Sequence, residues 1–196
     1  MIKSSIRSFY NFIFNSAFRS KKVFSLYVHI STKIGYKSKI MRNVILDKEC
    51  SVGNYTYIGE YTSITKTTIG NFCSIASNVR IGHGEHNLET FSTNSLFFKK
   101  SYLTQKSCVI KNDVWIGTEA VISRGVTIGN GAVIGANSFV NKDIPDYAIV
   151  VGSPAKILRY RFDTTTRKKL LATEWWNFKD LEEIKTIFKS INNDEI

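Results

Sequence analysis

Two histidines, His83 and His86, stand three residues apart in a stretch of the chain that also holds several aromatic residues. An imidazole has an unperturbed pKa of ~6.5, so it is the side chain best suited to take a proton from a hydroxyl or an amine at neutral pH. Glu85 and Glu89 lie beside His86 and offer carboxylates that could orient its ring, although solvated loop glutamates are the alternative we favour. These residue types predict general-base chemistry, which the surrounding elements must position.

Outside this stretch, an aliphatic residue recurs at every sixth position, with a single step of five. The members are Val52, Ile58, Ile64, Ile69, Ile75, Ile81, Ile110, Ile116, Ile122, Ile128, Ile134 and Val140. This period is neither the 3.6 of a helix nor the 2 of an ordinary strand series, and a regular internal repeat is typical of a solenoid. A six-residue repeat, often followed by glycine, suits one face of a three-sided coil with about eighteen residues per turn.

A second register lies two residues before each aliphatic position and holds only small or β-branched residues. It comprises Cys50, Thr56, Thr62, Thr67, Cys73, Val79, Cys108, Val114, Ala120, Val126, Ala132 and Ser138. Residues two apart in a strand share a face, so both registers should point into the core. The three cysteines all belong to this register and form no CxxC pair, so we interpret them as core residues and expect no metal site.

The six-residue rhythm stops between Ile81 and Ile110, and residues 82–107 form an insertion that contains His83 and His86. Long excursions from a regular scaffold often carry function. The sequence therefore predicts an active-site loop, which leaves the coil and returns to it.

Several runs of sequence resemble the hexapeptide-repeat acyltransferases, and among them the xenobiotic-acetyltransferase branch. That branch contains type B chloramphenicol and streptogramin acetyltransferases and related sugar O-acetyltransferases. The similar runs are Ile69-Gly-Asn-Phe-Cys-Ser-Ile75, Gly84-Glu-His86, Ser92-Thr93, Leu96-Phe97, Asn112-Asp-Val-Trp-Ile-Gly117, Asp143-Ile-Pro-Asp-Tyr-Ala-Ile-Val-Val-Gly-Ser-Pro-Ala-Lys156, Arg161-Phe and Trp175-Trp176. The resemblance covers about residues 50 to 180.

This resemblance implies an all-β solenoid, a left-handed parallel β-helix, that uses acetyl-CoA as co-substrate and requires no metal. His86 matches the family's catalytic histidine, six residues before the Ser92-Thr93 pair, and His83 is the rival candidate. His29 is expected to serve surface or packing roles. Backbone N–H groups are the expected donors to the oxyanion. The resemblance also implies a homotrimer with its sites between subunits.

The resemblance further implies a set of cofactor-binding positions. They are Trp115, at the thiol end of the pantetheine channel, and Thr118, Ala136, Asn141, Lys142, Lys156 and Arg159, which line the channel or meet the phosphates. Lysine and arginine suit phosphate groups on chemical grounds too. The alternatives are plain surface lysines at 142 and 156 and an outward packing role for the tryptophan.

Charge and hydrophobic patterning divide the chain into three parts. Residues 1–42 hold nine of the 27 basic residues and no acidic one, so most of the net charge of +11 lies there. We predict a basic amphipathic N-terminal arm at 1–42, a β-helix at 43–160 and a helical cap at 161–196, with a break in the helix near Trp176–Asn177. The cap's two tryptophans are expected to pack. Residues 1–22 could contact a membrane surface peripherally or pack on the trimer.

The resemblance implies transfer of acetyl from acetyl-CoA, and together with the basic arm it favours a sugar hydroxyl of a cell-surface glycan or its precursor as the acceptor. The alternatives are N-acetylation of a nucleotide-linked amino sugar, O-acetylation of an antibiotic, and a silent β-helix scaffold. The near-neutral charge of residues 43–196 disfavours nucleic-acid binding. We expect a cytoplasmic protein, with the inner face of the membrane as the other location.

Overall fold

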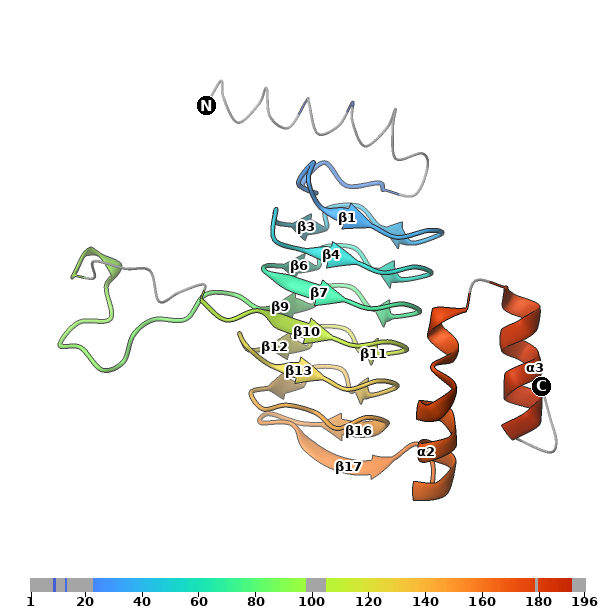
Figure 1. Ribbon diagram of the computed structural model, residues 1–196. Helices are drawn as coiled ribbons and strands as arrows, with labels where there is room; N and C mark the ends of the chain where they lie inside the picture. Colours follow the sequence, from blue (N-terminus) through green and yellow to red (C-terminus); the bar gives the residue numbers. More distant parts are fainter. Residues whose placement is uncertain (1–8, 10–12, 14–22, 98–104, 179, 192–196) are drawn as a thin grey trace.

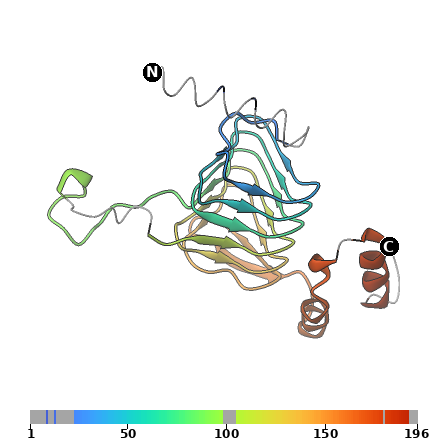
Figure 2. The same cartoon turned by 45° about the horizontal axis from the view of Figure 1, so that its top comes forward.

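The protein is a three-sided parallel β-helix with helices along one side (Figures 1 and 2). A computed structural model describes residues 9, 13, 23–97, 105–178 and 180–191. Sheet 1 contains β1 (Lys33–Ile34), β4 (Ser51–Val52), β7 (Thr67–Ile69), β10 (Cys108–Ile110) and β13 (Thr127–Ile128). Sheet 2 contains β2 (Lys39–Ile40), β5 (Tyr57–Ile58), β8 (Ser74–Ile75), β11 (Trp115–Ile116), β14 (Val133–Ile134), β16 (Ala148–Val151) and β17 (Lys156–Tyr160). Sheet 3 contains β3 (Ile45–Leu46), β6 (Ser63–Ile64), β9 (Arg80–Ile81), β12 (Val121–Ile122) and β15 (Phe139–Val140).

The strand register confirms the six-residue repeat. Each strand from β1 to β12 pairs in parallel with the strand three places further along the chain, as Trp115 on β11 does with Val133 on β14. The single five-residue step shortens its coil by one residue, so that Tyr57 pairs with Ser74. The missing residue is accommodated at the corner turn between β6 and β7, which contains Lys66 with a φ of 43°. The strands on either side of this turn therefore keep their parallel pairing.

The core consists of the two predicted registers. Every one of their 24 members is buried. The small residues also tie coils together: the Thr56 hydroxyl donates to the carbonyl of Gly70 at 2.9 Å, and the Cys73 thiol donates to that of Lys111 at 3.0 Å. Burial raises the pKa of Cys50 and Cys73 to about 12, so both thiols stay protonated. The prediction that the cysteines are core residues is confirmed.

A ladder of polar side chains follows the corner between sheets 1 and 2. Its members are Asn54, Asn71, Asn112, Asn130 and Asp146. The side-chain oxygen of each later member accepts the backbone N–H of the member before it; the Asn54 N–H reaches Asn71 Oδ1 at 2.7 Å. These bonds satisfy turn amides that the sheets leave unpaired, so the ladder stabilises the corner.

The coils begin earlier than the predicted boundary at residue 43. Strands β1 and β2 precede it, and bridges join Val23 to Ile40 and Val28 to Leu46. The reason is that the six-residue spacing continues backward from Val52 through Leu46, Ile40 and Ile34 to Val28. The amphipathic face predicted near the start of the arm lies almost wholly outside the described residues.

The C-terminal helices pack beside the coils. They are α2 (Thr164–Thr173), η4 (Trp175–Asn177) and α3 (Leu181–Ile191), and the short helix η4 stands at the predicted break. Trp175 and Trp176 are buried, and the Trp175 ring lies 5.1 Å from that of Phe72 on the coil. The last parallel strand, β16, is instead covered by antiparallel β17. The tryptophans therefore pack as predicted, but the helices flank the coils (Figure 1), and their cap role falls to β17.

Candidate active site

The insertion leaves the coil after β9 and returns at β10, and it projects away from the stack (Figures 1 and 2). Its described part is residues 82–97 and 105–107, with one short helix, η2 (Ser95–Phe97). Leu88, Phe91, Leu96 and Phe97 are all largely exposed in the single chain. An extended arm that carries apolar side chains into solvent is suited to contact another surface.

His86 lies on this arm with one ring nitrogen fixed. Its Nδ1 is 2.6 Å from the backbone carbonyl oxygen of Thr93. A carbonyl only accepts hydrogen bonds, so Nδ1 must carry the proton. In the neutral ring the lone pair is then on Nε2, which is the nitrogen that a general base needs free. Thr93 belongs to the Ser-Thr pair of the motif, but the sequence assigned it no role, because a backbone carbonyl leaves no side-chain signal.

His83 lies at the root of the arm. Its Nε2 is 3.3 Å from the carbonyl oxygen of Ser63, so this nitrogen donates a hydrogen bond to the coil. The Nε2 of His83 is therefore engaged, unlike the Nε2 of His86, which bonds none of the described residues. Among the contacts of the described residues, none joins the carboxylate of Glu85 or Glu89 to the His86 ring. The orienting group observed is therefore the Thr93 carbonyl.

Thr118 and Ala136 lie together at the corner between sheets 2 and 3. The Thr118 hydroxyl donates to the carbonyl of Ser77 at 2.9 Å, and its carbonyl accepts the N–H of Asn137 at 3.0 Å. Gly117 permits this close stacking, since a Cβ there would lie 2.5 Å from the nitrogen of Ala136. Trp115, on β11 just before this corner, is 57% exposed on the outer face of sheet 2. This corner therefore offers exposed groups beside an aromatic wall.

The remaining predicted cofactor residues lie elsewhere on the chain. Asn141 and Lys142 are exposed and follow β15, at the corner between sheets 3 and 1 from which the arm also emerges. Lys156 and Arg159 are exposed on β17. Within one chain the predicted cofactor residues therefore lie apart, along both edges of sheet 3 and on β17. The reason is that successive corners of a three-sided coil face different directions.

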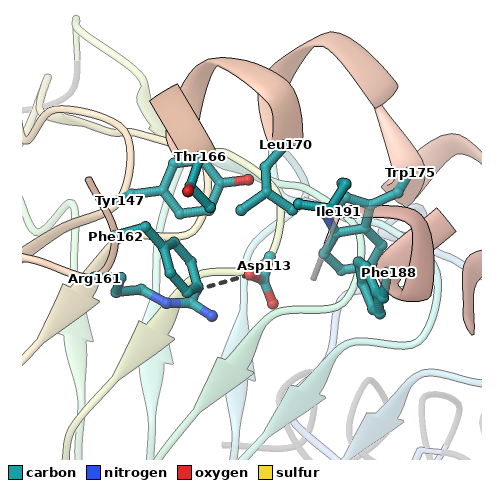
Figure 3. A pocket seen from close by; sticks show the side chains of 9 residues that line it. All are labelled: Asp113, Tyr147, Arg161, Phe162, Thr166, Leu170, Trp175, Phe188 and Ile191. Carbon is teal, nitrogen blue, oxygen red and sulfur yellow. Dashed lines mark hydrogen bonds and ion pairs between the residues drawn. The ribbon is translucent and has the colours of Figure 1, made fainter. Parts of the chain in front are cut away.

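A cavity of about 270 Å³ lies between the coils and the C-terminal helices (Figure 3). Arg161 Nη1 donates to Asp113 Oδ2 at 2.8 Å on one side of it, and Leu170, Trp175 and Phe188 line the other. Burial raises the pKa of Asp113, and the neighbouring guanidinium opposes that rise. None of the predicted site residues lines this cavity, so it belongs to the joint between coil and helices.

Known proteins similar to this chain share its repeat. The sequence profile described as bacterial transferase hexapeptide (six repeats) matches residues 107–142. A chloramphenicol acetyltransferase of Agrobacterium fabrum is 36% identical over 177 residues, which cover 73% of this chain and 85% of that protein. A galactoside O-acetyltransferase of Escherichia coli is 38% identical over 109 residues, covering 54% of this chain and 48% of that protein.

A solved structure has the same architecture. A hexapeptide-repeat-containing acetyltransferase of Vibrio cholerae, complexed with acetyl-CoA, matches with a TM-score of 0.59 and 26% identity, covering 81% of this chain and 87% of that one. The repeat, the fold and these similarities show that the chain belongs to the hexapeptide-repeat acetyltransferases, whose fold is the left-handed parallel β-helix. Its reaction class is accordingly acyl transfer from acetyl-CoA.

Proposed function

We propose that this protein transfers the acetyl group of acetyl-CoA to a hydroxyl of a sugar, on a cell-surface glycan or its precursor, with His86 as the general base. The observation that carries the proposal is the 2.6 Å contact between His86 Nδ1 and the Thr93 carbonyl. It leaves the Nε2 lone pair free on an exposed arm, which is the state that deprotonation of an acceptor requires.

The chemistry needs one base and one set of oxyanion donors. As the acceptor oxygen attacks the thioester carbonyl carbon, Nε2 takes the hydroxyl proton, and backbone N–H groups stabilise the negative oxygen. The tetrahedral intermediate collapses when the C–S bond breaks, and the sulfur receives the proton from the imidazolium. The products are an acetyl ester and free CoA, and the imidazole returns to its starting state.

A closed site requires a second subunit in this proposal. His86 belongs to the insertion, which projects away from its own coil (Figure 1), whereas Thr118 and Ala136 stand at the opposite edge of sheet 3. The outer face of that sheet presents apolar Ile45, Val121 and Phe139, all at least 37% exposed in the single chain. A trimer that packs these faces would bury them and bring the arm of one subunit to the corner of the next.

The cofactor groups fit the same arrangement. Exposed cations at Lys142, Lys156 and Arg159 can meet phosphates, and Asn141 can hydrogen-bond the pantetheine amides. Trp115 supplies an apolar wall for the thiol end. Membrane contact through residues 1–22 stays a prediction from sequence; of the helices that the structure describes, none is both long and apolar enough to cross a bilayer.

An acceptor screen tests the proposal. Purified protein is incubated with acetyl-CoA and a panel of galactosides, glycan precursors, nucleotide-linked amino sugars and chloramphenicol, and free thiol is measured. The proposal predicts thiol release with a saccharide and a product that hydroxylamine cleaves, as esters are cleaved. A product that resists hydroxylamine would be an amide and would establish the N-acetylation alternative.

O-acetylation of an antibiotic is the second candidate, because the chloramphenicol acetyltransferase of A. fabrum matches over more of this chain than the galactoside enzyme does. Both reactions use a hydroxyl acceptor and the same base. A kcat/KM for chloramphenicol at least tenfold above that for every saccharide would select this candidate.

A further inference from the structure

The two ends of the insertion meet at the corner between sheets 3 and 1. The outgoing end begins at Gly82, whose N–H donates to the carbonyl of Ile122 at 3.0 Å. The incoming end finishes before Cys108, whose N–H donates to the carbonyl of Lys66 at 3.1 Å. Thr65, on the preceding coil, donates its hydroxyl hydrogen to the Gly82 carbonyl. Both ends of the insertion are therefore hydrogen-bonded to the coil.

One side chain bridges them. Arg124 stands in the turn after β12, and its Nη1 donates to the carbonyl of Lys106, on the incoming end, at 2.9 Å. Its Nε lies 3.4 Å from the carbonyl of His83, on the outgoing end, and its Nη2 donates to the Thr65 hydroxyl at 2.7 Å. A guanidinium can serve three acceptors at once because it presents five N–H donors in a rigid plane.

We propose that Arg124 is a positioning residue, which clamps both ends of the insertion to the coil and so sets the place of His86, three residues beyond His83. This rests on the proposed function for the role of His86. A lysine cannot replace the arginine, since a single ammonium on a flexible stem cannot span two carbonyls and a hydroxyl along one plane. The neighbouring Gly125 adds to the fit, because a Cβ there would lie 2.9 Å from the Lys106 side chain.

The experiment compares Arg124→Lys with Arg42→Lys, a matched control whose arginine is exposed and pairs only loosely with Glu60 at 3.7 Å. Hydrogen exchange is followed in peptides that cover 82–86 and 105–108. Loss of charge-assisted bonds should speed exchange in both root peptides roughly ten- to hundredfold. Exchange in β11 and β14 should not change, and Arg42→Lys should match wild type throughout.

Kinetics supply the second readout. In Arg124→Lys, kcat should fall about 10- to 100-fold, because a small displacement of a base is costly, while the Kd for acetyl-CoA stays unchanged. Unchanged exchange at the root would overturn the clamp. Faster exchange with a wild-type kcat would overturn the positioning role, as would a loss confined to the affinity for acetyl-CoA.

A second pair of variants tests the clamp independently, in case Arg124→Lys does not fold. Thr65→Val removes the hydroxyl that Arg124 and Gly82 share, and Thr65→Ser retains it. Thr65→Val should loosen both roots and Thr65→Ser should not; equal exchange in the two variants would overturn the clamp. If the wild-type protein transfers no acetyl group to any acceptor, the proposed function fails, whereas the exchange results still decide whether Arg124 holds the arm.

Discussion

Replacement of Asn71 tests how the coil corner and the C-terminal helices are held. Its Oδ1 accepts the Asn54 N–H at 2.7 Å, and its Nδ2 donates to the carbonyl of Trp176 at 2.9 Å. Each bond contributes about 1 kcal/mol, and a part-buried partner left unsatisfied adds to the loss. Asn71→Ala should therefore lower the free energy of unfolding by about 2–4 kcal/mol.

Urea unfolding followed by circular dichroism, at fixed protein concentration, measures this loss. With a slope of about 2 kcal/mol per molar urea, the midpoint should fall by about 1–2 M. Asn71→Asp keeps the oxygen that accepts from Asn54 but places an acceptor oxygen against the Trp176 carbonyl, so it should lose at least the contribution of the Trp176 bond, about 1 kcal/mol. Asn177 is exposed, and among the residues that the structure describes its side chain bonds only Glu174, so Asn177→Ala serves as the control. A loss in Asn71→Ala no larger than in the control would refute the ladder as a stabilising feature.

Three further predictions concern the thiols, the cofactor phosphates and the arm. Burial raises the pKa of Cys50 and Cys73 from 9.0 to about 12, so their contribution to stability is complete below pH 9 and is lost as the pH rises toward 12. Both thiols should resist alkylation at pH 8 until urea unfolds the chain, and alkylation of the native protein would contradict their burial. In a Cys50→Ala, Cys73→Ala double variant the urea midpoint should decline less steeply as the pH rises above 9. Lys156→Gln and Arg159→Gln should each raise the KM for acetyl-CoA in steady-state assays and leave acceptor KM unchanged, and the opposite pattern would move the residue to the acceptor side. Deletion of residues 1–22 should preserve the proposed trimer and the activity on small acceptors but reduce sedimentation with anionic vesicles, where each cation contributes about 1 kcal/mol. Full-length protein that does not bind such vesicles at low salt would exclude the membrane contact.

The regular coils could be predicted from sequence because each position repeats the same environment. The register of small residues and the aliphatic register two positions after it predict the inward residues, and the five-residue aliphatic step from Ile64 to Ile69 corresponds to a coil that is one residue shorter. The same register also runs through Val28 and Ile40. The concentration of basic residues up to Arg42 nevertheless indicates a separate arm, and this charge pattern hides the continuation of the coils.

Features that depend on backbone groups or on uneven spacing were not predictable. The Thr93 carbonyl that orients His86 is a backbone atom, and any residue type would supply it. The members of the corner ladder are separated by 17, 41, 18 and 16 residues, so the insertion and the short coil hide the repeat. Arg124 acts on two carbonyls across the insertion, and only the fold brings those atoms together.

We propose that His86, and not His83, is the base. The two histidines are close in sequence but differ in contacts: Nδ1 of His86 is held and its Nε2 lone pair is free, whereas Nε2 of His83 donates to Ser63. Single-turnover and steady-state kinetics of His86→Ala and His83→Ala, with acetyl-CoA affinity measured by calorimetry, separate them. His86→Ala should lower kcat by about 10²–10⁴-fold at unchanged acetyl-CoA Kd, with a far smaller loss in His83→Ala. Equal losses in the two variants, or a His86→Ala enzyme with nearly full kcat, would contradict the assignment.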